Sequence, residues 1–268
     1  MYHNLELENQ VINIVKEASK LIKNMDFAVT EKDGNSNIVT TNDLLVQKFL
    51  CDNLIKLIPN SSFYCEENNI RDFSKEYVWI IDPIDGTTNY SRGIAECAIS
   101  VGLLHNNNSV LGVVYNIFQD EVFSATVNLG ARLNNKLIKV SERKFNESIL
   151  CTAMSLYKKS LAEPCNKIIY DIYMKCNDYR RFGSCALELC YLACGRCDLY
   201  FEIRVFPWDY AGAYLILKEA GGVLKGFDKQ ELLFDKTTTL VGANNKSNFN
   251  KINAVINKYL TLEMLKEL

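Results

Sequence analysis

Histidine is scarce in this sequence, and its scarcity argues against several kinds of active site. Only two histidines occur among 268 residues: His3 lies in the N-terminal tail and His105 beside a run of asparagines. We expect both to be exposed loop residues. A Ser-His-Asp or Cys-His nucleophile needs a histidine as its base, so neither is well supported. The chain also contains no GxGxxG, Walker or GxSxG motif.

Long apolar runs and an excess of positive charge are missing as well. No apolar run approaches the ~20 residues that a membrane helix needs. The N-terminal stretch MYHNLELENQ is acidic and polar, which is unlike a signal peptide. The net charge is −2, and Lys and Arg are scattered rather than clustered. We therefore expect a cytoplasmic protein that binds neither membranes nor nucleic acid.

Ten cysteines raise the question of disulfides or zinc. Their spacing is irregular, and most lie inside apolar helical or strand patterns. Only Cys194-Gly-Arg-Cys197 has the spacing of a metal-binding pair, and no matching second pair follows. We expect buried free thiols, which agrees with a reducing cytoplasm.

The periodicity of apolar residues predicts two halves with different rhythms. In residues 1–147, helical spacing covers 5–24, and a second helix follows Thr41 or Asn42 as its cap. The runs YVWIID, CAISVGLL, SVLGVVYNI and EVFSATV then predict strands, the last three as a meander.

In residues 148–268, predicted strands and helices alternate, which is typical of α/β structure. YRRFG and CDLYFEI are predicted strands, and 161–176, 184–194 and 208–220 are predicted helices. Only four prolines occur, and no Pro/Gly/Ser linker separates the halves. We expect one compact unit of two halves, an α+β or α/β layered sandwich in which helix and sheet layers alternate.

The stretch IIDPIDGTTNY places Asp82 and Asp85 three residues apart, directly after a buried strand. One phosphate chemistry that uses such acids is that of the aspartyl nucleophiles in haloacid dehalogenase-like enzymes. Their signature is Asp-x-Asp-Gly-Thr, with the second acid two residues after the first. Here Pro83 stands two residues before Asp85, so the two acids cannot take those roles together.

The other phosphate chemistry is metal binding. Neighbouring carboxylates repel each other, and keeping both ionised requires a cation between them. Mg²⁺ prefers such hard oxygen ligands. Asp82 could bridge two ions. Asp85 could bind one of these ions, and the Ile84 carbonyl could bind the other. The residues 86–88 then open a short helix, whose free N–H groups suit a phosphate. Taken alone, the stretch could still be an acidic turn that caps a helix.

Acids at three other predicted element ends point to the same chemistry. Glu66 lies in CEEN, Asp209 in PWDYAGAYLILKEAGG and Asp43 in IVTTND. Each has an ordinary interpretation by itself, as a surface acid or a helix-terminal charge. Together with WIIDPIDGTTNY and RRFGSCALELC, and in this order, they resemble the inositol monophosphatase family over roughly residues 30–225.

The resemblance implies a sugar-phosphatase type of layered fold, a homodimer, sensitivity to lithium and two or three Mg²⁺ ions. It implies Mg²⁺-assisted hydrolysis of a phosphate monoester without a covalent intermediate. The metal ligands would be Glu66, Asp82, Ile84, Asp85 and Asp209. Asp43 and Thr87 would orient the attacking water, and Glu66 would take part in catalysis through a third ion. The substrate-binding residues would be Gly86, Thr87, Thr88, Ser184, Cys185 and Glu202. Lys32 falls at a position near this site where relatives often have a lysine.

The implied substrate is a small phosphorylated alcohol or sugar, with inositol 1-phosphate first. Alternatives with the same metal site are a fructose-1,6-bisphosphatase, a 3′(2′),5′-bisphosphate nucleotidase and a histidinol-phosphate phosphatase. A non-catalytic binding module is the competing class, but it predicts loss of Asp43 or Thr87, and both are present. Cys185 and Arg204 replace the small residues usual in the pocket. Arg204 could contact a second anionic group or simply pair with an acid such as Glu202.

Overall fold

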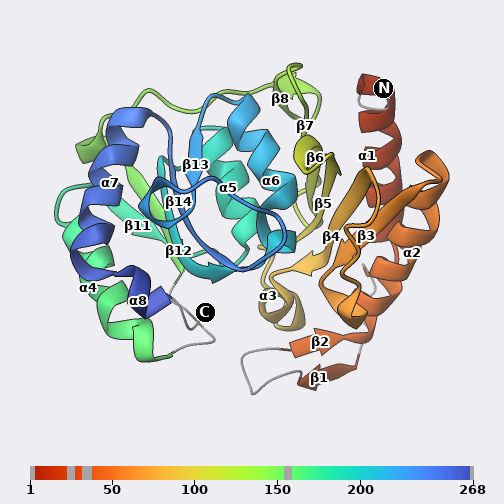
Figure 1. Ribbon diagram of the computed structural model, residues 1–268, viewed down its shortest axis with the longest axis horizontal. Coiled ribbons are helices and arrows are strands. Elements are labelled where there is room, and N and C mark those ends of the chain that lie inside the picture. The colour runs from red at the N-terminus through yellow and green to blue at the C-terminus, as the bar shows by residue number, and fades with distance from the viewer. Residues whose placement is uncertain (1–3, 23–27, 32–37, 154–158, 266–268) are drawn as a thin grey trace.

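The computed structural model describes residues 4–22, 28–31, 38–153 and 159–265. Three layers of helices alternate with two β-sheets (Figure 1). The helices are α1 (Leu5–Ser19), α2 (Thr41–Leu57), α3 (Thr87–Ser91), α4 (Ala162–Tyr173), α5 (Cys185–Ala193), α6 (Pro207–Glu219), α7 (Lys246–Tyr259) and α8 (Leu262–Leu265). This arrangement confirms the predicted layered sandwich.

The larger sheet has seven strands in chain order, from β3 to β9. Only β3 and β4 are parallel, and all later neighbours are antiparallel. The strands are β3 (Ser61–Cys65), β4 (Tyr77–Asp85), β5 (Ala98–His105), β6 (Asn108–Asn116), β7 (Glu121–Thr126), β8 (Ala131–Leu133) and β9 (Lys136–Leu137). The predicted meander is therefore confirmed as β5, β6 and β7.

The smaller sheet has five strands in the order β11-β10-β12-β14-β13. Its strands are β10 (Ile149–Ala153), β11 (Asp178–Arg180), β12 (Leu199–Val205), β13 (Val223–Lys225) and β14 (Thr238–Ala243). A separate hairpin consists of β1 (Val29–Glu31) and β2 (Ile38–Thr40). The strands of the two large sheets thus come from before and after residue 148, while the domain boundary there stays a prediction.

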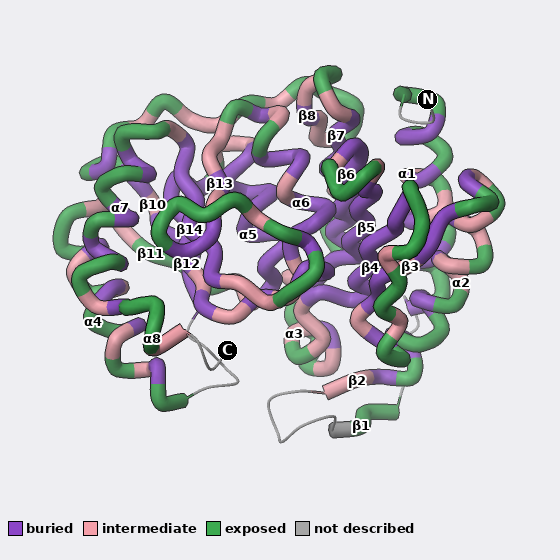
Figure 2. The backbone as a smooth tube through the Cα atoms, in the orientation of Figure 1, coloured by how far each residue is buried: buried purple, intermediate pink, exposed green. Residues whose placement is uncertain are grey.

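Alternating side chains on the strands explain the layers. On β4, Trp79 and Ile81 pack with α1 and α2, whereas Val78 and Ile80 pack with α5 and α6 between the two sheets. Successive strand residues point to opposite faces, so a strand that is apolar throughout is buried on both sides. Helices α4 and α7 cover the outer face of the smaller sheet. Figure 2 shows buried residues along the strands and along α5 and α6, and exposed residues mainly in the connecting loops and the outer helices.

Helix α6 lies unusually close to the larger sheet, and three glycines make this possible. A Cβ atom on Gly112 would lie 2.1 Å from the carbonyl oxygen of Gly212, and one on Gly102 would lie 3.0 Å from Ala211. Both obstacles are backbone or Cβ atoms that cannot swing away. The contact fixes α6 against β5 and β6, and thereby places its first turn, which carries Asp209.

We expect Gly112→Ala to destabilise the protein by ~1–3 kcal/mol, because the added methyl group overpacks this contact. Thermal unfolding should shift down by ~2–4 °C per kcal/mol. Gly226→Ala is the matched control, since its nearest neighbour is the Thr238 hydroxyl at 3.3 Å and its φ is ordinary. A melting temperature of Gly112→Ala equal to that of Gly226→Ala would contradict the close approach.

Several local predictions need correction. The cap of α2 is Thr40, not Thr41 or Asn42, since its hydroxyl accepts the Asp43 N–H. The apolar positions after this cap, Leu45, Phe49, Leu50, Leu54 and Leu57, predict one buried helix face, but Leu45 is 54% exposed and Val46 is buried instead. The strand predicted at YRRFG ends at Arg180.

Two further expectations can be compared with the structure. All ten cysteines are free thiols, as expected. None of the helices in the described ranges combines the length and hydropathy that a membrane span requires. Lys32 lies outside the described residues.

Candidate active site

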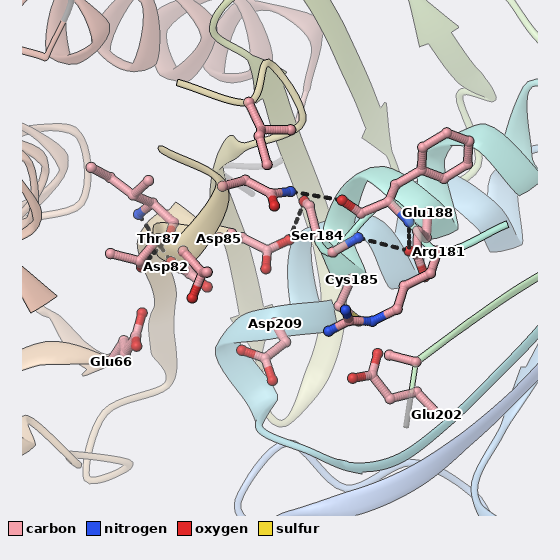
Figure 3. A pocket seen from close by; sticks show the side chains of 18 of the residues that line it. Glu66, Asp82, Asp85, Thr87, Arg181, Ser184, Cys185, Glu188, Glu202 and Asp209 are labelled. Atoms are coloured by element: carbon pink, nitrogen blue, oxygen red, sulfur yellow. Dashed lines mark hydrogen bonds between the residues drawn. The ribbon is translucent and has the colours of Figure 1, made fainter. Parts of the chain in front are cut away.

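A cavity of about 570 Å³ opens between the end of β4, the N-termini of α5 and α6, and β12 (Figure 3). Every residue predicted for the site lines it except Asp43, which is buried just behind. The predicted residues on its wall are Glu66, Asp82, Ile84, Asp85, Gly86, Thr87, Thr88, Ser184, Cys185, Glu202 and Asp209. Residues that are up to 143 positions apart in sequence, Glu66 and Asp209, thus reach one space.

An irregularity at the end of β4 directs the paired acids. The pairing with β5 shifts register between Asp82 and Asp85. Asp82 is 1% exposed, and its Oδ1 accepts the Ile84 N–H at 3.0 Å. Asp85 lies at the same strand end and accepts hydrogen bonds at Oδ2 from the Ser184 hydroxyl at 2.5 Å and the Ala186 N–H at 2.7 Å. The N-terminus of α5 therefore holds Asp85.

Asp209 and Glu66 complete the acidic half of the cavity. Asp209 lies in the first turn of α6, where a carboxylate is favoured, and its Oδ2 accepts the Phe206 N–H at 2.7 Å. Glu66 follows β3, and its own N–H donates to the Ile81 carbonyl at 3.1 Å. Figure 3 shows Glu66, Asp82, Asp85 and Asp209 pointing toward a common region from three separate segments.

The electrostatics of these acids favour a bound cation. Burial raises the pKa of Asp85 to about 6, although the hydrogen bonds from Ser184 and Ala186 lower it. The pKa of Asp82 lies well above its usual range because of burial and then the charges of Glu66, Asp85 and Asp209. Burial, followed by the charge of Asp85, likewise raises that of Asp209. Ionised carboxylates are thus costly here without a positive partner.

Chemically, these donors fit a hard divalent cation such as Mg²⁺, which prefers carboxylate and carbonyl oxygens. Within the described residues, no three acidic, histidine or cysteine side chains stand together as a complete metal site. The fit therefore rests on the kind and number of donors and on their repulsion.

The raised pKa values predict how the stability of the metal-free protein depends on pH. A carboxyl group with a pKa raised in the folded state stabilises the fold below its unfolded pKa, and this contribution is lost as pH rises through the folded value. For Asp85, this stabilisation is lost over the pH range from 3.8, the ordinary pKa of the group, to about 6, its pKa in the folded protein. Between pH 5.5 and 7.5, ionisation of Asp85 alone should lower the free energy of unfolding of the metal-free protein by about 1 kcal/mol. Asp82 and Asp209, whose pKa values are also raised, should lower it further.

We therefore expect the melting temperature of the chelator-treated protein to fall from pH 5.5 to pH 7.5. Saturating Mg²⁺ should reduce or reverse the fall, because a cation favours the ionised acids. Asp209→Asn should flatten the profile of the metal-free protein. A profile that neither Mg²⁺ nor this substitution changes would show that the acids are not coupled as described.

Asp43 lies behind the acids of the cavity wall and contacts Thr87. It is 0% exposed, and its Oδ2 accepts the Thr40 N–H at 2.7 Å as well as the Thr40 hydroxyl. Its Oδ1 lies 3.3 Å from the Thr87 hydroxyl, which is also 2.9 Å from the Ile84 carbonyl. One hydroxyl proton serves only one acceptor at a time, so Thr87 can alternate between them.

The half of the cavity opposite the four acids contains the carboxyl group of Glu202 beside a tyrosine and a cysteine. Glu202 receives a hydrogen bond from the Tyr200 hydroxyl at 2.5 Å, and the same hydroxyl lies 3.1 Å from the Cys185 sulfur. Burial raises the pKa of Glu202 to about 7. This carboxyl group can therefore accept or donate a hydrogen bond near neutral pH.

Two charged residues of the cavity were not assigned a role from the sequence. Glu188 is 1% exposed, and its Oε1 accepts the N–H groups of Phe182 at 2.6 Å and Gly183 at 3.1 Å. Arg181 lies on the wall just before this turn. Both belong to the stretch RRFGSCALELC, but nothing in one sequence tells which of its charges face the cavity.

Comparison with known proteins agrees with this geometry. The chain matches the inositol monophosphatase family over residues 1–261. It is 37% identical to inositol monophosphatase 1 of Solanum lycopersicum, with 79% of this chain and 80% of that protein covered. It is 35% identical to Nus factor SuhB of Vibrio cholerae, with 78% and 79% covered. The solved Thermotoga maritima IMPase superimposes with a TM-score of 0.85 at 28% identity, covering 98% of this chain and 100% of that one. The chain therefore belongs to the inositol monophosphatase family, whose members named inositol monophosphatases are phosphoric monoester hydrolases.

Proposed function

We propose that this protein hydrolyses a small phosphate monoester with the help of Mg²⁺. The observation that carries the proposal is the convergence of Glu66, Asp82, Asp85 and Asp209 on one cavity. Their burial and mutual repulsion leave the ionised acids in need of cations. Family membership supports the same reaction class.

In this proposal, Glu66, Asp82, Asp85, Asp209 and the Ile84 carbonyl hold two or three Mg²⁺ ions. Bound Mg²⁺ supplies a water of lowered pKa and neutralises charge on the phosphoryl oxygens. The chain itself orients the reactants. Thr87, held by Asp43, orients the attacking water, and Gly86 and Thr88 contact the phosphate.

On the alcohol side, Ser184, Cys185 and Glu202 contact the substrate. Inositol 1-phosphate is the first candidate substrate, because several relatives are named inositol monophosphatases. Fructose 1,6-bisphosphate and adenosine 3′,5′-bisphosphate are the alternatives that the same acidic site would also serve.

A phosphate-release screen tests this function. Purified protein with Mg²⁺ is offered inositol 1-phosphate, fructose 1,6-bisphosphate, adenosine 3′,5′-bisphosphate and histidinol phosphate, each with and without chelator. Release that depends on Mg²⁺ supports the reaction, and its absence with all four substrates would count against it. A Li⁺ series at fixed Mg²⁺ should show inhibition if the protein follows the inositol branch.

We also propose that the protein works as a cytoplasmic homodimer, on the family resemblance. Its partner is a small phosphorylated alcohol or sugar rather than nucleic acid or a membrane, because its net charge is −2 with scattered basic residues. Sedimentation equilibrium decides the oligomeric state: a mass near 30.6 kDa would contradict a dimer.

A further inference from the structure

Two adjacent arginines at the end of β11, Arg180 within the strand and Arg181 just after it, have opposite surroundings. Arg180 donates to the carboxylate of Asp178 and to the Tyr179 carbonyl on the surface. Arg181 extends into the cavity, where its guanidinium lies between Asp209 and Glu202 in Figure 3. Within the described part of the chain, Arg181 has no hydrogen bond and no ion pair within 4 Å. Its side chain is exposed, so its donors face the space that a substrate would occupy.

A third arginine reaches the same wall through a break in β12. The pairing of β12 with β14 shifts between Glu202 and Val205, and Arg204 in this gap has a φ of 60°. A side chain other than glycine rarely adopts this left-handed conformation, and such strain is concentrated at functional sites. Arg204 lines the cavity, with its guanidinium carbon 5.9 Å from the centre of the Phe206 ring.

The acids on this wall have other hydrogen-bond partners. Glu188 accepts two backbone N–H groups, and Glu202 accepts the Tyr200 hydroxyl. Arg181 still lowers the pKa of Glu202 by its charge, against the larger effect of burial. The two groups are thus near each other without forming an ion pair. This leaves the Arg181 guanidinium able to accept a new anionic partner.

We propose that Arg181 and Arg204 bind a second anionic group of the substrate, a carboxylate or a phosphate, while the acidic half of the cavity handles the reacting phosphate. The proposal rests on the proposed function and extends its substrate class beyond inositol 1-phosphate. A guanidinium offers a planar fork of donors that matches the oxygens of either group. The cavity of about 570 Å³ is large enough for a sugar bisphosphate.

Matched substrate pairs test the proposal. Glycerol 3-phosphate and 3-phosphoglycerate differ only in a CH₂OH group against a carboxylate. Fructose 1-phosphate and fructose 1,6-bisphosphate differ only in the second phosphate. For each pair, the ratio of kcat/KM for the more anionic to the less anionic ester is measured with Mg²⁺. We expect at least one ratio to exceed one, and the pair concerned distinguishes carboxylate from phosphate.

Arg181→Ala should lower that ratio about 10- to 100-fold, the usual effect of losing a charged hydrogen bond, and Arg181→Lys should lower it less. Arg180→Ala is the matched control, since it removes the same charge one residue away, and it should leave the ratio unchanged. Arg204→Gly should also lower the ratio. Its melting temperature should change by less than about 3 °C, because glycine adopts the same φ without strain.

Ratios near one for both pairs, or equal effects of Arg180→Ala and Arg181→Ala, would overturn the proposal while leaving phosphatase activity intact. Binding of D-glycerate, measured by NMR titration, separates this outcome from failure of the proposed function. If no ester is hydrolysed but glycerate binds and Arg181→Ala weakens it, the anion site stands and the hydrolytic function falls. If Arg181→Ala changes neither glycerate binding nor the ratio of either substrate pair, the anion site is refuted, and the hydrolytic function is judged from phosphate release alone.

Discussion

Replacing Asp85 by asparagine should lower kcat by about 10²–10³-fold and raise the Mg²⁺ concentration needed for half-maximal activity. The substitution keeps the shape of the side chain and one acceptor oxygen for the Ser184 hydroxyl and the Ala186 N–H. It removes only the negative charge that acts on Asp82 and Asp209 in the same cavity. Steady-state kinetics over a range of Mg²⁺ measures both effects.

The fold should survive this change, which makes the loss of activity interpretable. An ionised Asp85 is costly in the metal-free protein, as its pKa of about 6 shows. Asp85→Asn should therefore melt no lower than wild type at pH 7.5 in the presence of chelator. Asp171→Asn, on the surface near Lys258, is the matched control and should keep normal turnover. Turnover of Asp85→Asn close to that of wild type would remove Asp85 from the proposed ligands.

The layers of the fold could be predicted because burial leaves a clear pattern in the sequence. YVWIID is apolar on both strand faces and indeed packs between two helical layers as part of β4. The errors occur where tertiary contacts decide. Leu45 and Val46 are equally apolar neighbours, and only the position of α2 against the sheet exposes one and buries the other. Short β13 and the hairpin β1–β2 carry too few residues for a pattern.

That acids gather at one cavity could be inferred from the sequence, whereas the places of Arg181 and Arg204 on its wall could not. Asp82 and Asp85 stand close in sequence after a strand, so their repulsion can be inferred without coordinates. Arg181 and Arg180 are chemically identical neighbours. Because β11 ends at Arg180, the two side chains point in different directions. The Arg180 guanidinium contacts Asp178, and the Arg181 guanidinium lies in the cavity. The strained φ of Arg204 is likewise a property of the β12 irregularity rather than of its residue type.

Asp43→Asn and Thr87→Val should each lower kcat by ~10²-fold, and the double variant should lose little more than the worse single one. The reason is that the Thr87 hydroxyl, 3.3 Å from Asp43 Oδ1, can orient a water only if its proton is drawn away from that water. The two residues would then act as one unit, and effects within such a unit are not additive. A double-mutant cycle on kcat measures this directly.

The control must separate water orientation from helix capping, because Asp43 also holds the start of α2 through Thr40. Thr40→Val removes the cap hydroxyl and should cost about 1 kcal/mol of stability, with a much smaller loss of kcat than Asp43→Asn. Additive losses in Asp43→Asn and Thr87→Val would show that the pair does not act together. If Thr40→Val lost as much kcat as Asp43→Asn, Asp43 would serve as a structural cap, and water would have to be oriented by other groups of the cavity.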